Sequence, residues 1–318
     1  MSITIVSGHS NPATPAPLNH RAYAQRHGYA YVFDATPYPL ETVWDQKLLA
    51  ILQVMKDPET EWIFWIDDDA IFTQLDVPLT QLRGKDVDAP WGPAADTDRR
   101  DIPLLERPES FHVCRSPVNP FGEWSAINAG LMIIRNTATM RDFIATILHT
   151  PMESVAAWWD PEVNGNLYAD DGDQERMQYL IATRGLAEQV GLHDPLAFNS
   201  RTYHLAERLD ELFVCHLANY RDKVQGYREL RERFGLSEYL LPPDELDHEL
   251  YRHSMFFHRP ALLPQCGADP ASESESEPAP TTRPLPPLTS RGARIVGDLE
   301  WQGRRLARWT ITRLRGGG

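Results

Sequence analysis

The sequence has no long apolar run and little cysteine. No stretch approaches the roughly 18 consecutive apolar residues of a membrane-spanning helix, and the N-terminus MSITIVSGHS lacks the basic and apolar regions of a secretory signal. The three cysteines, Cys114, Cys215 and Cys266, have neither the number nor the spacing of a disulfide framework or a zinc site. We therefore expect a cytoplasmic protein with two packed thiols and one thiol in a loop.

Positive charge is also scarce over most of the chain. The net charge of the 318 residues is −14, and because residues 291–318 carry +5, residues 1–290 carry −19. An acidic body repels nucleic acid, so we expect no nucleic-acid substrate. The same charge is suited to a site that binds a cation.

The composition changes at residue 264. Residues 264–290 are rich in Pro, Ser and Glu and cannot bury much apolar area, which predicts a disordered linker between a domain over 1–263 and a tail over 291–318. Four apolar residues of the tail recur roughly on one helical face among arginines: Ile295, Leu299, Leu306 and Trp309. This pattern predicts an amphipathic helix that meets anionic lipid or an acidic partner at the membrane periphery. A merely solvated tail is the alternative.

Apolar patterning in the first third of the chain alternates between strand and helix. Residues 3–7 and 29–33 predict strands, and the continuous apolar run at 62–66 is typical of a strand covered on both faces. Residues 18–28, closed by Gly28, predict a helix, and a stripe at helical spacing predicts a second one: Trp44, Leu48, Ile51, Leu52 and Met55. This alternation predicts an α/β fold with a mainly parallel sheet and right-handed crossovers.

The second half of the chain continues less regularly. Residues 83–126 are rich in Pro, Asp and Trp and predict a long loop region over a site. Beyond them we predict a strand over 126–136, a helix around 140–148, a helix over 173–185 and a late strand over 212–219.

Three consecutive aspartates follow the apolar strand in EWIFWIDDDAIF, residues 61–72. They lie at the carboxyl end of a central strand, the edge where open α/β sheets bind ligands. Alternate residues of a strand share a face, so Asp67 and Asp69 can converge while Asp68 points away. Buried carboxylates need a partner, and two converging carboxylates predict a site for Mn²⁺ or Mg²⁺ with open positions for phosphate oxygens. A solvated acidic turn is the alternative interpretation.

Six segments, in order, resemble the galactosyl/mannosyl/xylosyltransferase family, which includes GMA12/MNN10-like and xyloglucan xylosyltransferase-like enzymes: NHRAYAQRHGYAYVF, VWDQKLLAILQVM, EWIFWIDDDAIF, INAGLMIIRNTATMRDFI, DGDQERMQYLI and LFVCHLAN. The resemblance covers roughly residues 3–220. It implies a GT-A-type glycosyltransferase fold and a divalent metal. It further implies transfer of a hexosyl or pentosyl unit, with retention of configuration, from a UDP- or GDP-sugar to a hydroxyl of a saccharide or other acceptor.

The resemblance also assigns the metal and the reaction centre. Asp67 and Asp69 match the family's Asp-X-Asp, and His216 matches the late histidine that completes the metal site. Asp173 and Gln174 match the acidic-Gln pair near the reacting carbon of the sugar, although Asp173 is also placed to cap its helix. No dedicated general base is expected, because the departing phosphate oxygen can take the acceptor proton.

Nine residues are candidates to contact the donor: Val6, Ser7, Gly8, Lys47, Asp68, Asn128, Gly130, Arg221 and Lys223. Asn128 and Gly130 match the family's Asn-X-Gly segment beneath the sugar, and Lys47 matches the lysine of its W-x-x-K helix, where a solvent-facing lysine is the alternative. The family usually shows HFxGC and then a lysine after the late histidine. This chain has HLANYRDK, so Arg221 or Lys223 is expected to supply that charge.

Two other functions fit parts of the pattern. A haloacid-dehalogenase-type phosphatase also places Asp-X-Asp after an apolar strand, but on its first strand and with Thr or Val where Ile71 stands here. A non-catalytic carbohydrate-binding protein on the same fold is the second alternative. The presence of all three metal candidates and of Asp173 argues against such a loss of catalysis.

Overall fold

The computed structural model describes residues 1–8, 14–36, 38, 42–92, 97–206, 212–218, 220 and 222–243. The predicted linker and tail, 264–290 and 291–318, lie outside these residues, as do Cys266 and Arg221. The division into a 1–263 domain, a linker and a tail therefore stays a prediction.

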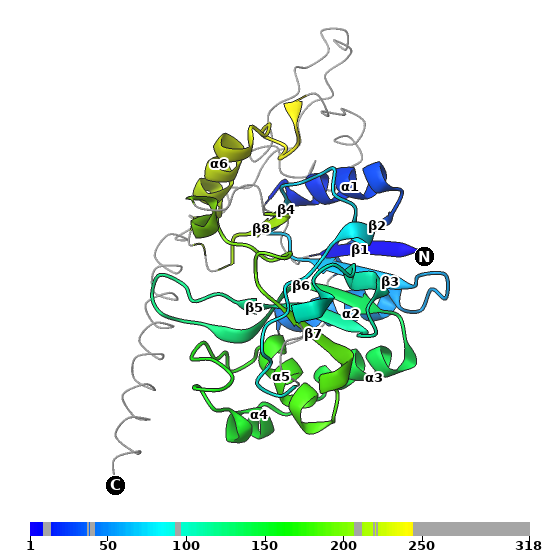
Figure 1. Cartoon of the computed structure of the whole chain (residues 1–318), viewed down its shortest axis with the longest axis vertical. Helices are drawn as coiled ribbons and strands as arrows, with labels where there is room; N and C mark the ends of the chain where they lie inside the picture. Colours follow the sequence, from blue (N-terminus) through cyan, green and yellow to red (C-terminus); the bar gives the residue numbers. More distant parts are fainter. Residues whose placement is uncertain are drawn as a thin grey trace, which may run out of the picture. The chain divides into compact units, whose positions relative to one another are not determined.

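Six strands form a central sheet in the order β2-β1-β3-β6-β5-β7 (Figure 1). They are β1 (Ile3–Gly8), β2 (Ala30–Asp34), β3 (Trp62–Ile66), β5 (Phe111–Ser116), β6 (Ser125–Arg135) and β7 (Val190–His193). The pairs β1–β2, β1–β3 and β5–β7 are parallel, and only β6 runs antiparallel to its neighbours in this sheet. The predicted α/β class with a mainly parallel sheet is confirmed.

Different helices cover the two faces of the sheet (Figure 1). The helices are α1 (Ala16–His27), α2 (Val43–Val54), α3 (Ala138–Ile147), α4 (Met152–Trp158), α5 (Asp173–Thr183) and α6 (Lys223–Phe234). Along β3, Trp62, Phe64 and Ile66 pack in the core cluster that includes α1, whereas Ile63 and Trp65 pack in the cluster with α2, α3 and α5. Burial on both faces explains why this strand is continuously apolar.

A second, two-stranded sheet brings the late strand to the aspartates. β4 (Ala70–Phe72) pairs antiparallel with β8 (Val214–His216), and the register places Ala70 opposite His216. The backbone N–H of Leu217 also donates to the carbonyl of Asp69 at 2.8 Å. This pairing crosses about half of the chain, and it is the element of the fold that completes the site.

Several predicted elements agree with the structure, and some were missed. Gly28 ends α1 in the left-handed conformation at φ 67°, as predicted, and Cys114 and Cys215 are buried free thiols. The region 83–126 is not only loop, because it contains β5. β4, β7, α4 and α6 were not predicted either. Five short 3₁₀ helices complete the regular structure of the described residues: Leu79–Gln81, Thr97–Arg99, Leu104–Glu106, Ala187–Gln189 and Thr202–Ala206.

No described helix combines the length and the apolar character needed to cross a membrane.

Candidate active site

Asp67, Asp68 and Asp69 form the turn between β3 and β4 rather than the end of a strand. The Asp67 N–H donates to the carbonyl of Gly130 at 2.9 Å, and the Ala70 N–H donates back to the carbonyl of Asp67 at 3.1 Å. The first and third aspartates converge because the chain turns between them. The predicted convergence is therefore present, but its predicted cause, alternation along an extended strand, is wrong.

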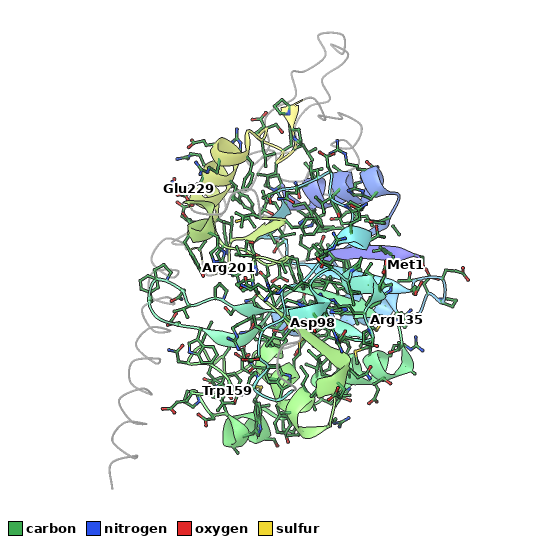
Figure 2. All side chains as sticks on the ribbon, viewed as in Figure 1. Met1, Asp98, Arg135, Trp159, Arg201 and Glu229 are labelled. Carbon is green, nitrogen blue, oxygen red and sulfur yellow. The ribbon has the colours of Figure 1, made fainter. Side chains whose placement is uncertain are left out.

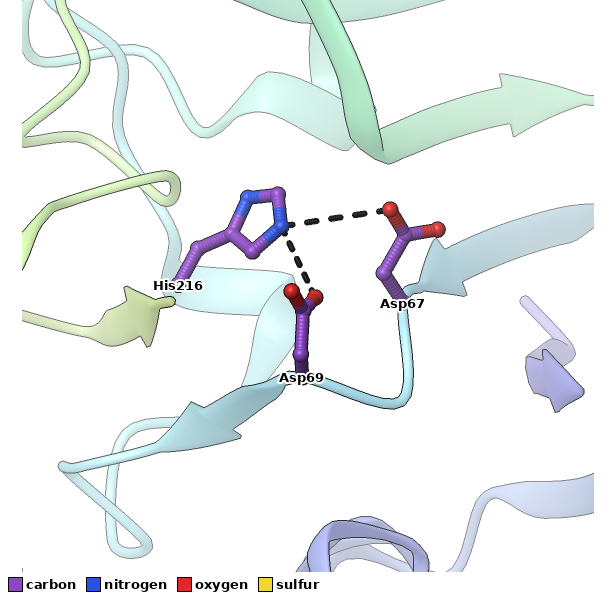
Figure 3. Close-up of side chains that lie close together, drawn as sticks. All are labelled: Asp67, Asp69 and His216. Atoms are coloured by element: carbon purple, nitrogen blue, oxygen red, sulfur yellow. Dashed lines mark ion pairs between the residues drawn. The ribbon is translucent and has the colours of Figure 1, made fainter. Parts of the chain in front are cut away.

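Three possible metal ligands meet at this turn. One oxygen each of Asp67 and Asp69 and one ring nitrogen of His216 all lie within 4.8 Å of one another. His216 Nε2 is 3.0 Å from Asp69 Oδ1 and 3.9 Å from Asp67 Oδ2 (Figure 3). Each residue leaves the end of a strand: β3 before Asp67, β4 after Asp69 and β8 at His216.

The remaining oxygen of each carboxylate has its own donor. Asp67 Oδ1 accepts from Trp65 Nε1 at 2.7 Å and lies 3.8 Å from Lys47 Nζ. Asp69 Oδ2 accepts from Lys223 Nζ, which also donates to the carbonyl of Leu217. These contacts hold the outer oxygens, so that the inner ones turn toward His216.

The donor set fits a divalent cation. Two carboxylate oxygens and an imidazole nitrogen are ligands that Mn²⁺ and Mg²⁺ sites use, and three protein ligands leave positions open for phosphate oxygens. The cluster is partly enclosed, because His216 is 3% exposed whereas the side chains of Asp67 and Asp69 are 23% and 18% exposed. Inward-facing acceptors at this depth repel one another unless a cation lies between them.

The carboxyl groups of the turn ionise unequally. Burial raises the pKa of Asp67, although Lys47 and His216 oppose the shift. Burial also opposes the charge of Asp69, but His216 and Lys223 beside it hold the pKa of that carboxyl well below its usual range. Burial and the charges of Asp69 and Asp67 raise the pKa of Asp68 to about 8. Asp69 is thus the group most firmly held as an anion.

Lys47 is a buried link between α2 and α5. Its side chain is 6% exposed, and Nζ lies 2.9 Å from Asp173 Oδ2 and 3.2 Å from the carbonyl oxygen of Ala129. Burial alone lowers the pKa of Lys47, but the charges of Asp173 and Asp67 raise it above the ordinary value. The alternative of a solvent-facing lysine was wrong.

Asp173 is the first residue of α5 rather than its cap. Gly172 occupies the N-cap position, and no side chain makes a cap hydrogen bond there. The Asp173 carboxylate is buried and paired with Lys47. Gln174, next to it, accepts from the Ala129 N–H at 3.4 Å. The two residues therefore lie beside β6, and Lys47 connects Asp173 to the metal candidate Asp67.

Asn128 and Gly130 lie where β6 passes the aspartate turn. Asn128 Oδ1 accepts from the Gly130 N–H at 3.2 Å and from Asn199 Nδ2 at 3.0 Å. A Cβ atom on Gly130 would lie 2.1 Å from His216 Cε1. This glycine thus makes room for the imidazole of a metal candidate, a role that the sequence did not indicate.

The other donor candidates are placed differently. Val6 and Ser7 are fully buried, and the Ser7 hydroxyl is 2.8 Å from the hydroxyl of Tyr31. Gly8 lies against the backbone of Asp34, where a Cβ atom would come within 2.1 Å of the Asp34 carbonyl oxygen. Lys223 reaches Asp69, as described above. An open hollow of about 740 Å³ along β2 contains none of the predicted site residues; it is lined by Val32, Phe33, Asp34, Ala35, Thr36, Tyr38 and Gln53.

Sequence patterns missed two residues of the site, Asn199 and Arg201. They precede β8 in the segment FNSRTYH, which has no motif that marks it. Both are buried, and Asn199 Oδ1 lies 3.0 Å from His216 Nδ1. Only the β4–β8 pairing, which brings His216 to the aspartates, shows that these two residues lie next to the metal candidates.

Residues 9–219 match the sequence model of the galactosyl transferase GMA12/MNN10 family. The chain belongs to this family. Proteins similar to this family member include galactomannan galactosyltransferase 1 of Cyamopsis tetragonoloba, 24% identical over 69% of this chain and 49% of the relative. The alpha-1,2-galactosyltransferase of Schizosaccharomyces pombe is 27% identical over 66% of this chain and 51% of the relative. The chain thus spans about half the length of these curated relatives.

A solved structure supports the fold of this GMA12/MNN10 family member. A glycosyltransferase involved in the glycosylation of the major capsid of PBCV-1 aligns over 73% of this chain and 100% of its own, with a TM-score of 0.53 and 17% identity. At that identity the likeness concerns the fold alone. The predicted GT-A-type architecture is confirmed.

Proposed function

We propose that this protein is a metal-dependent retaining glycosyltransferase, which moves a sugar from a nucleoside diphosphate to an acceptor hydroxyl. The observation that carries the proposal is the convergence of Asp67, Asp69 and His216 at the carboxyl edge of the sheet. Membership of the GMA12/MNN10 family supports the same reaction class.

The metal would be held by Asp67 Oδ2, Asp69 Oδ1 and His216 Nε2. When bound, Mn²⁺ or Mg²⁺ supplies positive charge that stabilises a diphosphate as a leaving group. Both cation types bind carboxylate oxygens, but Mg²⁺ takes oxygen ligands, so of the two ions the imidazole nitrogen favours Mn²⁺. We therefore propose Mn²⁺ as the first ion to test.

The protein's own charges prepare the site for an anionic donor. Lys223 contacts Asp69 at the rim of the cluster, with its side chain 36% exposed, so its ammonium is available to a diphosphate. Lys47 is enclosed by Asp173, Asp67 and the backbone of β6, so its ammonium neutralises the acidic residues instead. Of the two lysines, we propose Lys223 for the diphosphate contact and Lys47 for holding Asp173 in place.

Asp173 and Gln174 are proposed to orient the sugar. The Asp173 carboxylate is buried, and its ion pair with Lys47 holds it in place beside β6, which suits a group that stabilises positive charge at the reacting carbon. We assign it no nucleophilic role. The acceptor oxygen bonds to the reacting carbon on the same face from which the diphosphate oxygen departs, so the departing oxygen takes the acceptor proton.

Galactose is the first donor sugar to test. The names of two relatives, galactomannan galactosyltransferase 1 and alpha-1,2-galactosyltransferase, both describe galactosyl transfer. The nucleotide and the acceptor saccharide are proposed only as classes.

The test is Mn²⁺-dependent release of nucleoside diphosphate from UDP- and GDP-sugars, measured with and without added oligosaccharides. We expect release by the wild type and none above background by Asp69→Ala. Asp76→Ala is the matched control, because Asp76 is 93% exposed and pairs with Arg26 at the surface. Circular dichroism establishes that both variants fold.

Three results contradict the proposal. Unchanged turnover by Asp69→Ala means that the cluster does not hold the metal. Hydrolysis of simple phosphate monoesters by the wild type indicates a phosphatase. Binding of oligosaccharides without any release of nucleoside diphosphate indicates a non-catalytic carbohydrate-binding protein.

A further inference from the structure

A buried amide stands directly behind the histidine of the metal cluster. Asn199 is 0% exposed, and its Oδ1 lies 3.0 Å from His216 Nδ1. Its Nδ2 donates to Asn128 Oδ1 at 3.0 Å and to the Asn128 carbonyl at 3.3 Å. One side chain therefore contacts both a metal candidate and a residue proposed to contact the donor sugar.

The partners of this amide determine which end is oxygen. A guanidinium can only donate, and Arg201 Nη1 donates to Asn199 Oδ1 at 2.5 Å and to the Asn199 carbonyl at 2.7 Å. A backbone carbonyl can only accept, so the end facing the Asn128 carbonyl is the NH₂ group. Arg201 is itself buried, at 5% exposure. Both ends of the amide are thus assigned by chemistry.

The orientation of the amide determines the tautomer of His216. Because Asn199 Oδ1 is an acceptor, His216 Nδ1 must carry the hydrogen and donate it. A neutral imidazole protonated at Nδ1 has its lone pair on Nε2, the atom that faces Asp67 and Asp69. Hydrogen bonds of this kind to the distal nitrogen orient metal-binding histidines and raise their basicity.

We propose that Arg201 and Asn199 are positioning residues that hold His216 in the Nδ1–H tautomer and direct Nε2 to the metal. This inference rests on the proposed function, because it presumes that the cluster binds a divalent ion. The Asn199 amide also links the metal ligand His216 to Asn128 by hydrogen bonds, so one side chain positions both the metal site and the sugar site.

Two substitutions of Asn199 separate the acceptor from the rest of the amide. Asn199→Leu keeps the branching of the side chain at Cγ but removes the acceptor for His216 Nδ1–H, and we expect Mn²⁺ to bind about 10–100-fold more weakly. Asn199→Asp keeps that acceptor beside Arg201, but it replaces the donor to Asn128 with an acceptor oxygen and adds a negative charge, which the Arg201 guanidinium faces. We expect it to bind Mn²⁺ within about threefold of the wild type.

The readouts need no turnover. Free Mn²⁺, titrated into the full chain and followed by electron paramagnetic resonance, measures affinity without a donor. Long-range ¹H–¹⁵N spectra report the His216 tautomer, with its signals assigned by their loss in His216→Gln. Asn136→Leu is the matched control. Asn136 follows Arg135 at the far end of β6 (Figure 2), and its side-chain NH₂ group donates to the backbone carbonyls of Met55, Asp57 and Thr60. We expect the control to lose stability but to keep Mn²⁺ affinity.

Each outcome has a defined meaning. Equal Mn²⁺ affinity in the wild type and in folded Asn199→Leu overturns this inference alone. Equally weak binding by Asn199→Asp and Asn199→Leu also overturns it, because the acceptor is then not what matters. Absence of Mn²⁺ binding by the wild type overturns the proposed metal site and this inference with it.

Discussion

Lys47→Met is expected to lower the free energy of unfolding by about 3–5 kcal/mol. Lys47 Nζ lies 2.9 Å from Asp173 Oδ2 and 3.8 Å from Asp67 Oδ1, and its side chain is 6% exposed. With an effective dielectric constant near 20, these contacts correspond to about 6 and about 4 kcal/mol of attraction. Desolvation offsets much of this, but removing one partner leaves the other charge buried without compensation, which costs about 3–5 kcal/mol.

A second substitution tests whether the loss comes from the ion pair. Asp173→Asn alone should cost less, because Lys47 keeps Asp67 and the carbonyl of Ala129. In Lys47→Met/Asp173→Asn, the buried Asp173 charge is gone, so the double variant should be more stable than the sum of the single losses predicts. A coupling energy of about 2 kcal/mol is within the range for contacting residues.

Urea unfolding followed by far-UV circular dichroism measures these energies, with EDTA present so that bound metal does not contribute. Lys85→Met is the matched control, because Lys85 lies 3.7 Å from Asp194 but is 60% exposed, and exposed pairs contribute at most about 1 kcal/mol. A loss below about 1 kcal/mol for Lys47→Met, or strictly additive losses in the double variant, would refute the reasoning.

Two further predictions concern His20 and Gly130. Burial lowers the pKa of His20 from 6.5 to about 4, so below pH 6.5 the unfolded chain binds a proton that the folded chain excludes. Between pH 7.5 and pH 5, the wild type should therefore lose about 2 kcal/mol more unfolding free energy than His20→Gln does. Equal losses in the two proteins, measured by urea unfolding, contradict this. Gly130→Ala should displace the His216 ring, because the added Cβ would lie 2.1 Å from His216 Cε1. We expect Mn²⁺ binding, measured by titration, to weaken at least tenfold. Unaltered binding would show that the ring tolerates the methyl group.

Short-range patterns predicted the elements that hold the aspartates. The apolar run before Asp67 must be buried on both sides, so a central strand followed from composition alone. β5 was missed because FHVCRS contains His112 and Arg115, which look unsuited to a core. In the structure His112 is fully buried against His193, 3.1 Å away on β7, a partner that no local pattern indicates.

The site divided in the same way. Asp67, Asp69, Asp173 and His216 were proposed from their positions in the sequence and from a family resemblance. The residues that contact these four could not be proposed in this way. The pairing of buried Lys47 with Asp173, the space that Gly130 leaves for His216 and the contact of the Asn199 amide with His216 all depend on tertiary packing. The role of Arg221 stays a prediction, since that residue lies outside the described part of the chain.

By itself, the sequence determined the alternation of strands and helices, the edge of the sheet at which the charges stand and the chemical types of the ligands. Those properties follow from local periodicity and from the cost of burying a charge. Only the tertiary structure decided that a turn brings Asp67 and Asp69 together and that the β4–β8 pairing places His216 beside them. The physical reason is that ligand geometry depends on contacts between segments about 150 residues apart, which backbone hydrogen bonds establish and local sequence does not encode.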